Sequence, residues 1–98
     1  TNNEAEYLAF LMATNYLVRL EIKKPGQISN VEFYLDSKLV VEQINRNWKI
    51  KKAELRQLAE SCWKNLSALP YPIAIKHLLR EKNKLADQLV NEAIDQAC

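Results

Sequence analysis

The stretch Asn30-Val-Glu-Phe-Tyr-Leu-Asp36-Ser37 decides the fold class of this chain. Its apolar residues Val31, Phe33 and Leu35 alternate with Glu32 and Tyr34, which is the two-residue period of a β-strand. The Asp-Ser pair at the end offers an N-cap, so a helix is expected to follow directly and to run through residue 44. A strand that leads straight into a helix indicates an α/β protein.

The rest of the chain predicts three further helices and one further strand. The helices show apolar residues spaced three or four apart, and the first and third stop before prolines. The expected elements are a helix over residues 5–22, a helix over 55–66, a strand over 71–77 and a helix from Asn83 to Ala97. In the first helix, the apolar stripe expected to face the core is Leu8, Leu11, Met12 and Val18.

The order helix-strand-helix-helix-strand-helix predicts one α/β domain over residues 1–98, with two parallel strands. Two strands alone make a poor sheet for four helices to cover, so we expect further strands from an upstream segment of the polypeptide or from a second copy of the chain. The length of 98 residues and the 48% apolar content fit one packed core.

Charge and cysteine content restrict the possible function classes. The net charge is only +2, so affinity for an anionic polymer would depend on how Lys and Arg are arranged. Cys62 and Cys98 show no metal-binding spacing, and no apolar run is long enough for export or for a membrane span. We therefore expect a cytoplasmic protein without a membrane partner.

Three acidic positions are expected to converge. They are Glu4 or Glu6 in the first turn of the first helix, Asp36 at the carboxyl end of a strand, and Asp87 near the start of the last helix. Clustered carboxylates repel one another unless a divalent cation neutralises them, and hard oxygen ligands suit Mg²⁺ or Mn²⁺. Each acid also has a purely structural interpretation, because Thr1-x-x-Glu4 matches a capping box and the two aspartates could serve helix N-termini.

The joint pattern resembles the ribonuclease H family. Three motifs match it in order and spacing over essentially the whole chain: Thr1-Asn-Asn-Glu-Ala-Glu6-Tyr, Tyr34-Leu-Asp36-Ser37, and His77-x5-Asn83-x3-Asp87. The resemblance implies a partial ribonuclease H-like fold, whose first three strands would precede residue 1. It also implies that the acid supplied by the first of those strands is missing from this chain.

The resemblance further implies the function and the roles of the site residues. The expected activity is a metal-dependent endonuclease that hydrolyses the RNA strand of RNA/DNA hybrids with two Mg²⁺ or Mn²⁺ ions, incomplete as given because of the missing acid. Glu6, Asp36 and Asp87 would hold the metals, and His77 would assist proton transfer or product release. Residues expected to contact nucleic acid or to orient the site are Asn2, Asn3, Ser37, Arg80 and Asn83.

A basic connector between the second and third helices is the expected substrate surface. Basic residues with an interleaved aromatic ring suit phosphate contacts and stacking. Here Trp48 is surrounded in the sequence by Arg46, Lys49, Lys51, Lys52 and Arg56. The alternative is a solvated corner between helices with Trp48 packed inward. A second possible function is a non-catalytic ribonuclease H-like module for nucleic-acid binding or assembly.

Overall fold

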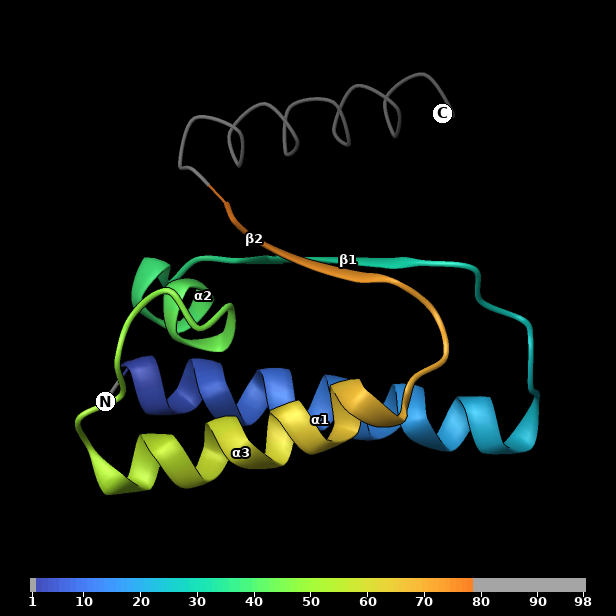
Figure 1. The fold of residues 1–98 in the computed structure, drawn as a ribbon, viewed down its shortest axis with the longest axis horizontal. Helices are drawn as coiled ribbons and strands as arrows, with labels where there is room; N and C mark the ends of the chain where they lie inside the picture. Colours follow the sequence, from blue (N-terminus) through green and yellow to red (C-terminus); the bar gives the residue numbers. More distant parts are fainter. Residues whose placement is uncertain (1, 79–98) are drawn as a thin grey trace, which may run out of the picture.

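The computed structural model describes residues 2–78 and has two layers (Figure 1). The elements are α1 (Asn2–Lys23), β1 (Val31–Leu35), α2 (Lys38–Ile44), α3 (Ala53–Ala68) and β2 (Ile73–His77). The predicted α/β class, the strands and the first three helices are therefore confirmed, with ends shifted by a few residues. The predicted helix from Asn83 to Ala97 lies outside the described residues.

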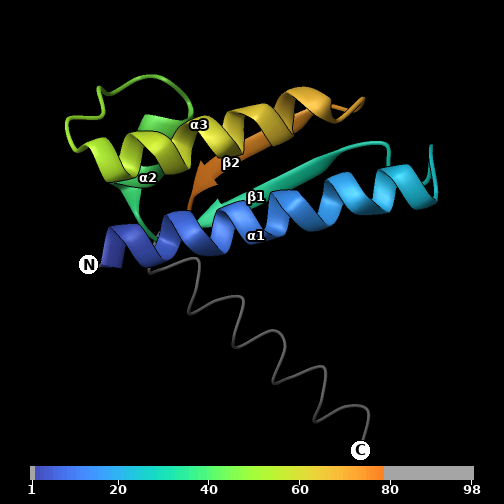
Figure 2. The ribbon, with the colours of Figure 1, turned by 90° about the horizontal axis from the view of Figure 1, so that it is seen from below.

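The two strands form a parallel pair in which Val31 lies opposite Ile73 and Leu35 lies opposite His77. Helices α1 and α3 lie side by side and cover one face of this pair, while α2 sits near the carboxyl ends of the strands (Figures 1 and 2). The parallel arrangement brings the ends of β1 and β2 to the same edge, where open α/β sheets place their ligands.

Helix α1 packs with a different face from the one its apolar residues predicted. Tyr7, Phe10 and Thr14 are buried, whereas Leu8 is 44% exposed and Met12 is 71% exposed. The buried residues recur at intervals of three and four, so the helical period is right but the stripe is rotated. The prediction that Leu8 and Met12 face the core is wrong for the residues that the structure describes.

The core joins all three helices to the inner face of the sheet. Its buried members are Tyr7, Phe10, Val40, Ile44, Leu55, Ala59 and Cys62. The Phe10 ring meets the Phe33 ring edge to face, with centroids 4.8 Å apart, a favourable aromatic geometry. Cys62 is fully buried, as its position on the apolar stripe of α3 predicted, and burial raises the pKa of its thiol to about 11.

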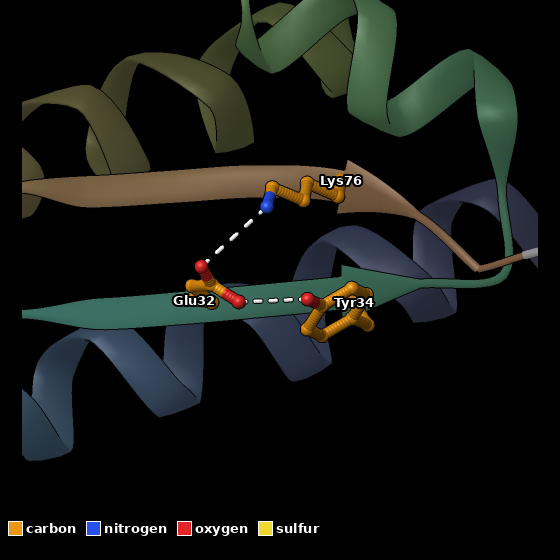
Figure 3. A network of polar contacts seen from close by, with 3 residues as sticks. All are labelled: Glu32, Tyr34 and Lys76. Carbon is orange, nitrogen blue, oxygen red and sulfur yellow. Dashed lines mark hydrogen bonds and ion pairs between the residues drawn. The ribbon is translucent and has the colours of Figure 1, made fainter. Parts of the chain in front are cut away.

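The opposite face of the sheet carries a polar network (Figure 3). The Tyr34 hydroxyl donates a hydrogen bond of 2.7 Å to Glu32 Oε2, and Lys76 Nζ lies 3.4 Å from Glu32 Oε1. The hydrogen bond from Tyr34 and the charge of Lys76 lower the pKa of the Glu32 carboxyl. These side chains are solvent-exposed, so the network adds little to stability.

No helix within residues 2–78 is long and apolar enough to cross a membrane.

Candidate active site

Glu6 and Asp36 meet at the carboxyl end of β1. Glu6 lies in the second turn of α1, and its Oε1 accepts a hydrogen bond of 3.2 Å from the backbone N–H of Asp36. Asp36 directly follows the last residue of β1, so the strand end sets its position. Two carboxylates that are 30 residues apart in sequence are thereby brought to one edge of the sheet.

A second contact joins the same two segments. The Ser37 hydroxyl donates a hydrogen bond of 2.9 Å to Asn3 Oδ1, and it accepts one of 3.2 Å from the backbone N–H of Val40. Ser37 has extended backbone geometry and is the N-cap of α2, as the sequence predicted. The hydroxyl therefore fixes the start of α2 and ties it to the first turn of α1.

These residues surround a solvent-open hollow of about 530 Å³, which we call the carboxylate hollow. It is lined by Asn2, Asn3, Ala5, Glu6, Asp36 and Ser37. Five of these six residues were predicted as site residues from the sequence, so the first and second motifs form one surface. Their chemical roles stay predictions.

His77 lies beside this hollow, at the carboxyl end of β2. Its Nε2 is 3.0 Å from the backbone oxygen of Asp36. A carbonyl oxygen can only accept a hydrogen bond, so this contact requires the proton on Nε2 and leaves Nδ1 as the acceptor nitrogen of the neutral ring. The parallel register, which pairs His77 with Leu35, accounts for the meeting.

The donor set fits a hard divalent cation in kind. Glu6 and Asp36 supply carboxylate oxygens, and Asn2 and Asn3 supply amide oxygens, which are the ligand types that Mg²⁺ and Mn²⁺ prefer. Within residues 2–78, no group of three or more His, Cys, Asp or Glu side chains is close enough to hold a metal ion. Asp87, the third predicted ligand, lies outside the described residues, as do Arg80 and Asn83.

A second hollow, of about 370 Å³, adjoins the first, and we call it the lysine hollow. Its lining includes Asn3, Gln43, Lys49, Lys51 and Lys52, with Leu39 and Leu55 as apolar members. Asn3 lines both hollows, so the three lysines of the connector and the two acids line adjoining parts of one surface. Lys52 was noted in the basic connector, but its place in this hollow was not predicted.

Trp48 lies on the surface of the connector. Its side chain is 45% exposed, and Lys38 Nζ lies 5.9 Å from the centroid of its ring. The inward packing considered as an alternative is therefore not observed for Trp48. Trp63 instead packs against the core. Its Nε1 donates a hydrogen bond of 2.9 Å to the Ile44 carbonyl, and the Arg46 guanidinium lies 3.8 Å from its ring centroid.

Sequence reasoning missed two buried polar residues behind the site. The Tyr7 hydroxyl donates a hydrogen bond of 2.7 Å to Gln43 Oε1, and Gln43 Nε2 donates one of 3.2 Å to the Lys49 carbonyl. The available signal was a glutamine placed between Val41 and Ile44 in a short helix that is otherwise largely apolar. A polar side chain at such a position needs a partner.

The family model described as "Reverse transcriptase-like" matches residues 1–93 of this chain. The bifunctional protein Rv2228c of Mycobacterium tuberculosis is 33% identical over 97 residues, which is 99% of this chain and 25% of that protein. The ribonuclease HI of Halobacterium salinarum is 33% identical over 97 residues, again 99% of this chain, and 45% of that protein.

A solved structure shares the fold. It is the N-terminal RNase H domain of Rv2228c from Mycobacterium tuberculosis, determined as a fusion with maltose-binding protein. The TM-score is 0.70 with 33% identity, over 99% of this chain and 65% of the solved chain. This chain therefore spans a quarter to just under half of the two curated relatives and about two thirds of the solved chain.

Proposed function

Because the chain belongs to the reverse transcriptase-like family and shares the ribonuclease H fold, we propose that it is part of a metal-dependent endonuclease that hydrolyses the RNA strand of RNA/DNA hybrids. The observation that carries the proposal is the meeting of Glu6 and Asp36 at the carboxyl end of β1. These two acids belong to two of the three motifs on which the resemblance rested, and the described part of the fold brings residues of both motifs to one hollow.

Glu6, Asp36 and Asp87 would hold the divalent ions. Carboxylates are needed in number because two dications and an anionic phosphodiester require bridging negative charge. When bound, Mg²⁺ or Mn²⁺ would supply a nucleophilic water at neutral pH and would stabilise charge on the departing 3′ oxygen. The hydrogen bond from the Asp36 N–H holds one oxygen of Glu6 in place, and this reduces the conformational entropy that Glu6 loses when it binds a ligand.

His77 is suited to moving a proton at the edge of this site. Its Nε2–H is engaged by the Asp36 carbonyl, so Nδ1 is the ring nitrogen that would accept or return a proton. The contact also places His77 next to the backbone of a proposed metal ligand. We assign it to proton transfer or product release rather than to metal binding.

The substrate would lie across both hollows. Asn2, Asn3 and Ser37 would contact the hybrid beside the carboxylates, with Arg80 and Asn83 completing that surface. Lys49 and Lys51 would bind phosphates, and the exposed ring of Trp48 would stack or pack against sugar. Phosphate contacts of this kind give affinity without sequence preference.

The proposal extends to the organisation of the whole protein. We take residues 1–98 as a single domain, with a sheet extended by further strands from the same polypeptide or from a second copy. The expected cytoplasmic location stays a prediction.

The matched pair Glu6→Gln and Glu4→Gln tests the proposed activity. Both residues lie near the start of α1, but only Glu6 lines the carboxylate hollow. Glutamine keeps an oxygen that can accept from the Asp36 N–H and removes the charge. We expect Glu6→Gln to lower hybrid cleavage by about 100-fold or more, on the scale of several kcal/mol of transition-state stabilisation, whereas Glu4→Gln should retain it.

Equal loss in both variants, or in neither, would contradict the assignment of Glu6. Hybrid binding without cleavage by the unmodified protein would favour the non-catalytic module instead.

A further inference from the structure

We propose that Tyr7 and Gln43 are positioning residues, which set the lysine-bearing connector at a fixed place relative to Glu6 and Asp36. The inference rests on the proposed function, because the connector is taken to bind the substrate. Neither residue lies in the carboxylate hollow, so they would act through the connector backbone and not on the reacting atoms.

Tyr7 is the residue that follows Glu6 in α1, and the turn of about 100° per helical residue directs its side chain into the core. Its side chain is fully buried, and its hydroxyl donates a 2.7 Å hydrogen bond to Gln43 Oε1. Burial, with a smaller contribution from Cys62, raises the pKa of Tyr7 to about 12. The hydroxyl therefore keeps its proton at neutral pH and remains a hydrogen-bond donor.

Gln43 links Tyr7 to the connector by hydrogen bonds. It is 4% exposed, with its Oε1 bound by Tyr7 and its Nε2 bound to the Lys49 carbonyl at 3.2 Å. A buried amide with an unpaired group is costly, so the two hydrogen bonds favour one orientation of Gln43 and one position of the Lys49 backbone. The chain from Tyr7 through Gln43 to Lys49 thus links the helix of Glu6 to the connector.

The connector segment that is held in this way carries the positive charge of the lysine hollow. Lys49 and Lys51 line that hollow together with Asn3 and Gln43. Asn3 also lines the carboxylate hollow, so the two surfaces share a wall. A shift of the Lys49 backbone would change where a phosphate is held relative to the carboxylates, and it would weaken the grip on the substrate.

Tyr34 provides a matched control for the loss of a tyrosine hydroxyl. It also donates a hydrogen bond of 2.7 Å to a side-chain oxygen, that of Glu32, but on the outer face of the sheet (Figure 3). The variants Tyr7→Phe and Tyr34→Phe therefore each remove a hydroxyl group that donates a hydrogen bond of 2.7 Å. Tyr7 is buried and Tyr34 is exposed.

The experiment measures the Kd of a fluorescein-labelled RNA/DNA hybrid of mixed sequence, together with kcat and KM for its cleavage, in the full protein. We expect Tyr7→Phe to raise Kd and KM by about three- to tenfold, the scale of one net hydrogen bond. Its effect on kcat should be smaller than its effect on KM. Tyr34→Phe should leave Kd within twofold of the wild type, roughly the scatter expected at a neutral surface site.

The decisive measurement is the Kd of Tyr7→Phe in a protein that also carries Lys49→Ala and Lys51→Ala. The effect of Tyr7→Phe on Kd should vanish there, because the groups that it positions are gone. A second variant, Gln43→Met, should reproduce the effect of Tyr7→Phe and should not add to it. Folding of each variant is checked by its circular dichroism and unfolding midpoint.

Three results would overturn the inference. An unchanged Kd and KM in Tyr7→Phe would do so while leaving the proposed function intact, provided that the wild type cleaves the hybrid. An equal effect of Tyr7→Phe with and without the two lysines would show a general structural role. Absence of hybrid binding by the wild type would overturn the proposed function and this inference together.

Discussion

The carboxylate of Glu6 is joined to the backbone N–H of Asp36 by a hydrogen bond of 3.2 Å. The backbone oxygen of the same aspartate lies 3.0 Å from His77 Nε2, at the end of β2. The backbone of Asp36 is therefore contacted from both α1 and β2, and its position is coupled to those of Glu6 and His77.

Loss of the Ser37 hydroxyl should destabilise the fold. The Ser37→Ala variant removes the N-cap of α2 and the contact with Asn3, so we expect the free energy of unfolding to fall by about 1 kcal/mol. Urea unfolding measures this. Ser61→Ala, at an exposed position inside α3, is the control and should be neutral or slightly stabilising. Equal stabilities for the two variants would be inconsistent with the cap.

Removal of the lysines at the second hollow should weaken hybrid binding in a salt-dependent way. For Lys49→Ala, Lys51→Ala and Lys52→Ala, each lost phosphate contact should reduce the slope of log K against log salt concentration by about 0.9. Affinity titrations at several salt concentrations give the slope.

The control for this measurement is Lys23→Ala combined with Lys24→Ala, at the far end of α1. These residues lie about 30 Å along the helix from its first turn, so their removal should leave the slope nearly unchanged. The same loss of slope in both sets would mean that the lysine hollow has no special part in binding.

Alkaline pH should destabilise the protein partly through Tyr7. Because the pKa of Tyr7 is raised from 10 to about 12, the folded state holds this proton more tightly than the unfolded chain does. The associated stability is fully present below pH 10 and is lost as the pH rises through 12. Cys62, whose pKa is raised from 9 to about 11, adds a similar loss that begins at lower pH.

Chemical unfolding at a series of pH values from 8 to 12 tests this assignment. The Tyr7→Phe variant should lose stability less steeply than the wild type above pH 10, after both are referred to their values at pH 8. Parallel curves for the two proteins would show that Tyr7 is not the group involved.

Local patterns were sufficient to predict the elements that position the site. The alternation in β1 and the cap residue Ser37 predicted a strand that leads to Asp36 and a helix that follows. Both elements are observed, with the strand ending one residue earlier, at Leu35. Asp36 was placed at a strand end, where parallel sheets present ligands, and this led to the prediction that it lies near an acid of α1. These features depend on short-range chemistry that is visible in the sequence.

The parts that sequence could not predict depend on distant partners. Apolar residues surround much of α1, so its spacing alone did not show that Tyr7 and Phe10 would be buried while Leu8 and Met12 would be exposed. The partner of Tyr7 lies 36 residues away in α2. The polar Gln43 in that helix indicates that a partner is needed, but not which residue supplies it. Packing against α3 and the sheet decides both features.

Cleavage of a labelled RNA/DNA hybrid tests the central claim most directly. The full protein is incubated with the hybrid in Mg²⁺ or Mn²⁺, alongside its Asp36→Asn variant. The account predicts cleavage of the RNA strand that requires the divalent ion and disappears in Asp36→Asn, although the variant still binds the hybrid. Undiminished cleavage by Asp36→Asn, or no cleavage by the unmodified protein, would contradict it.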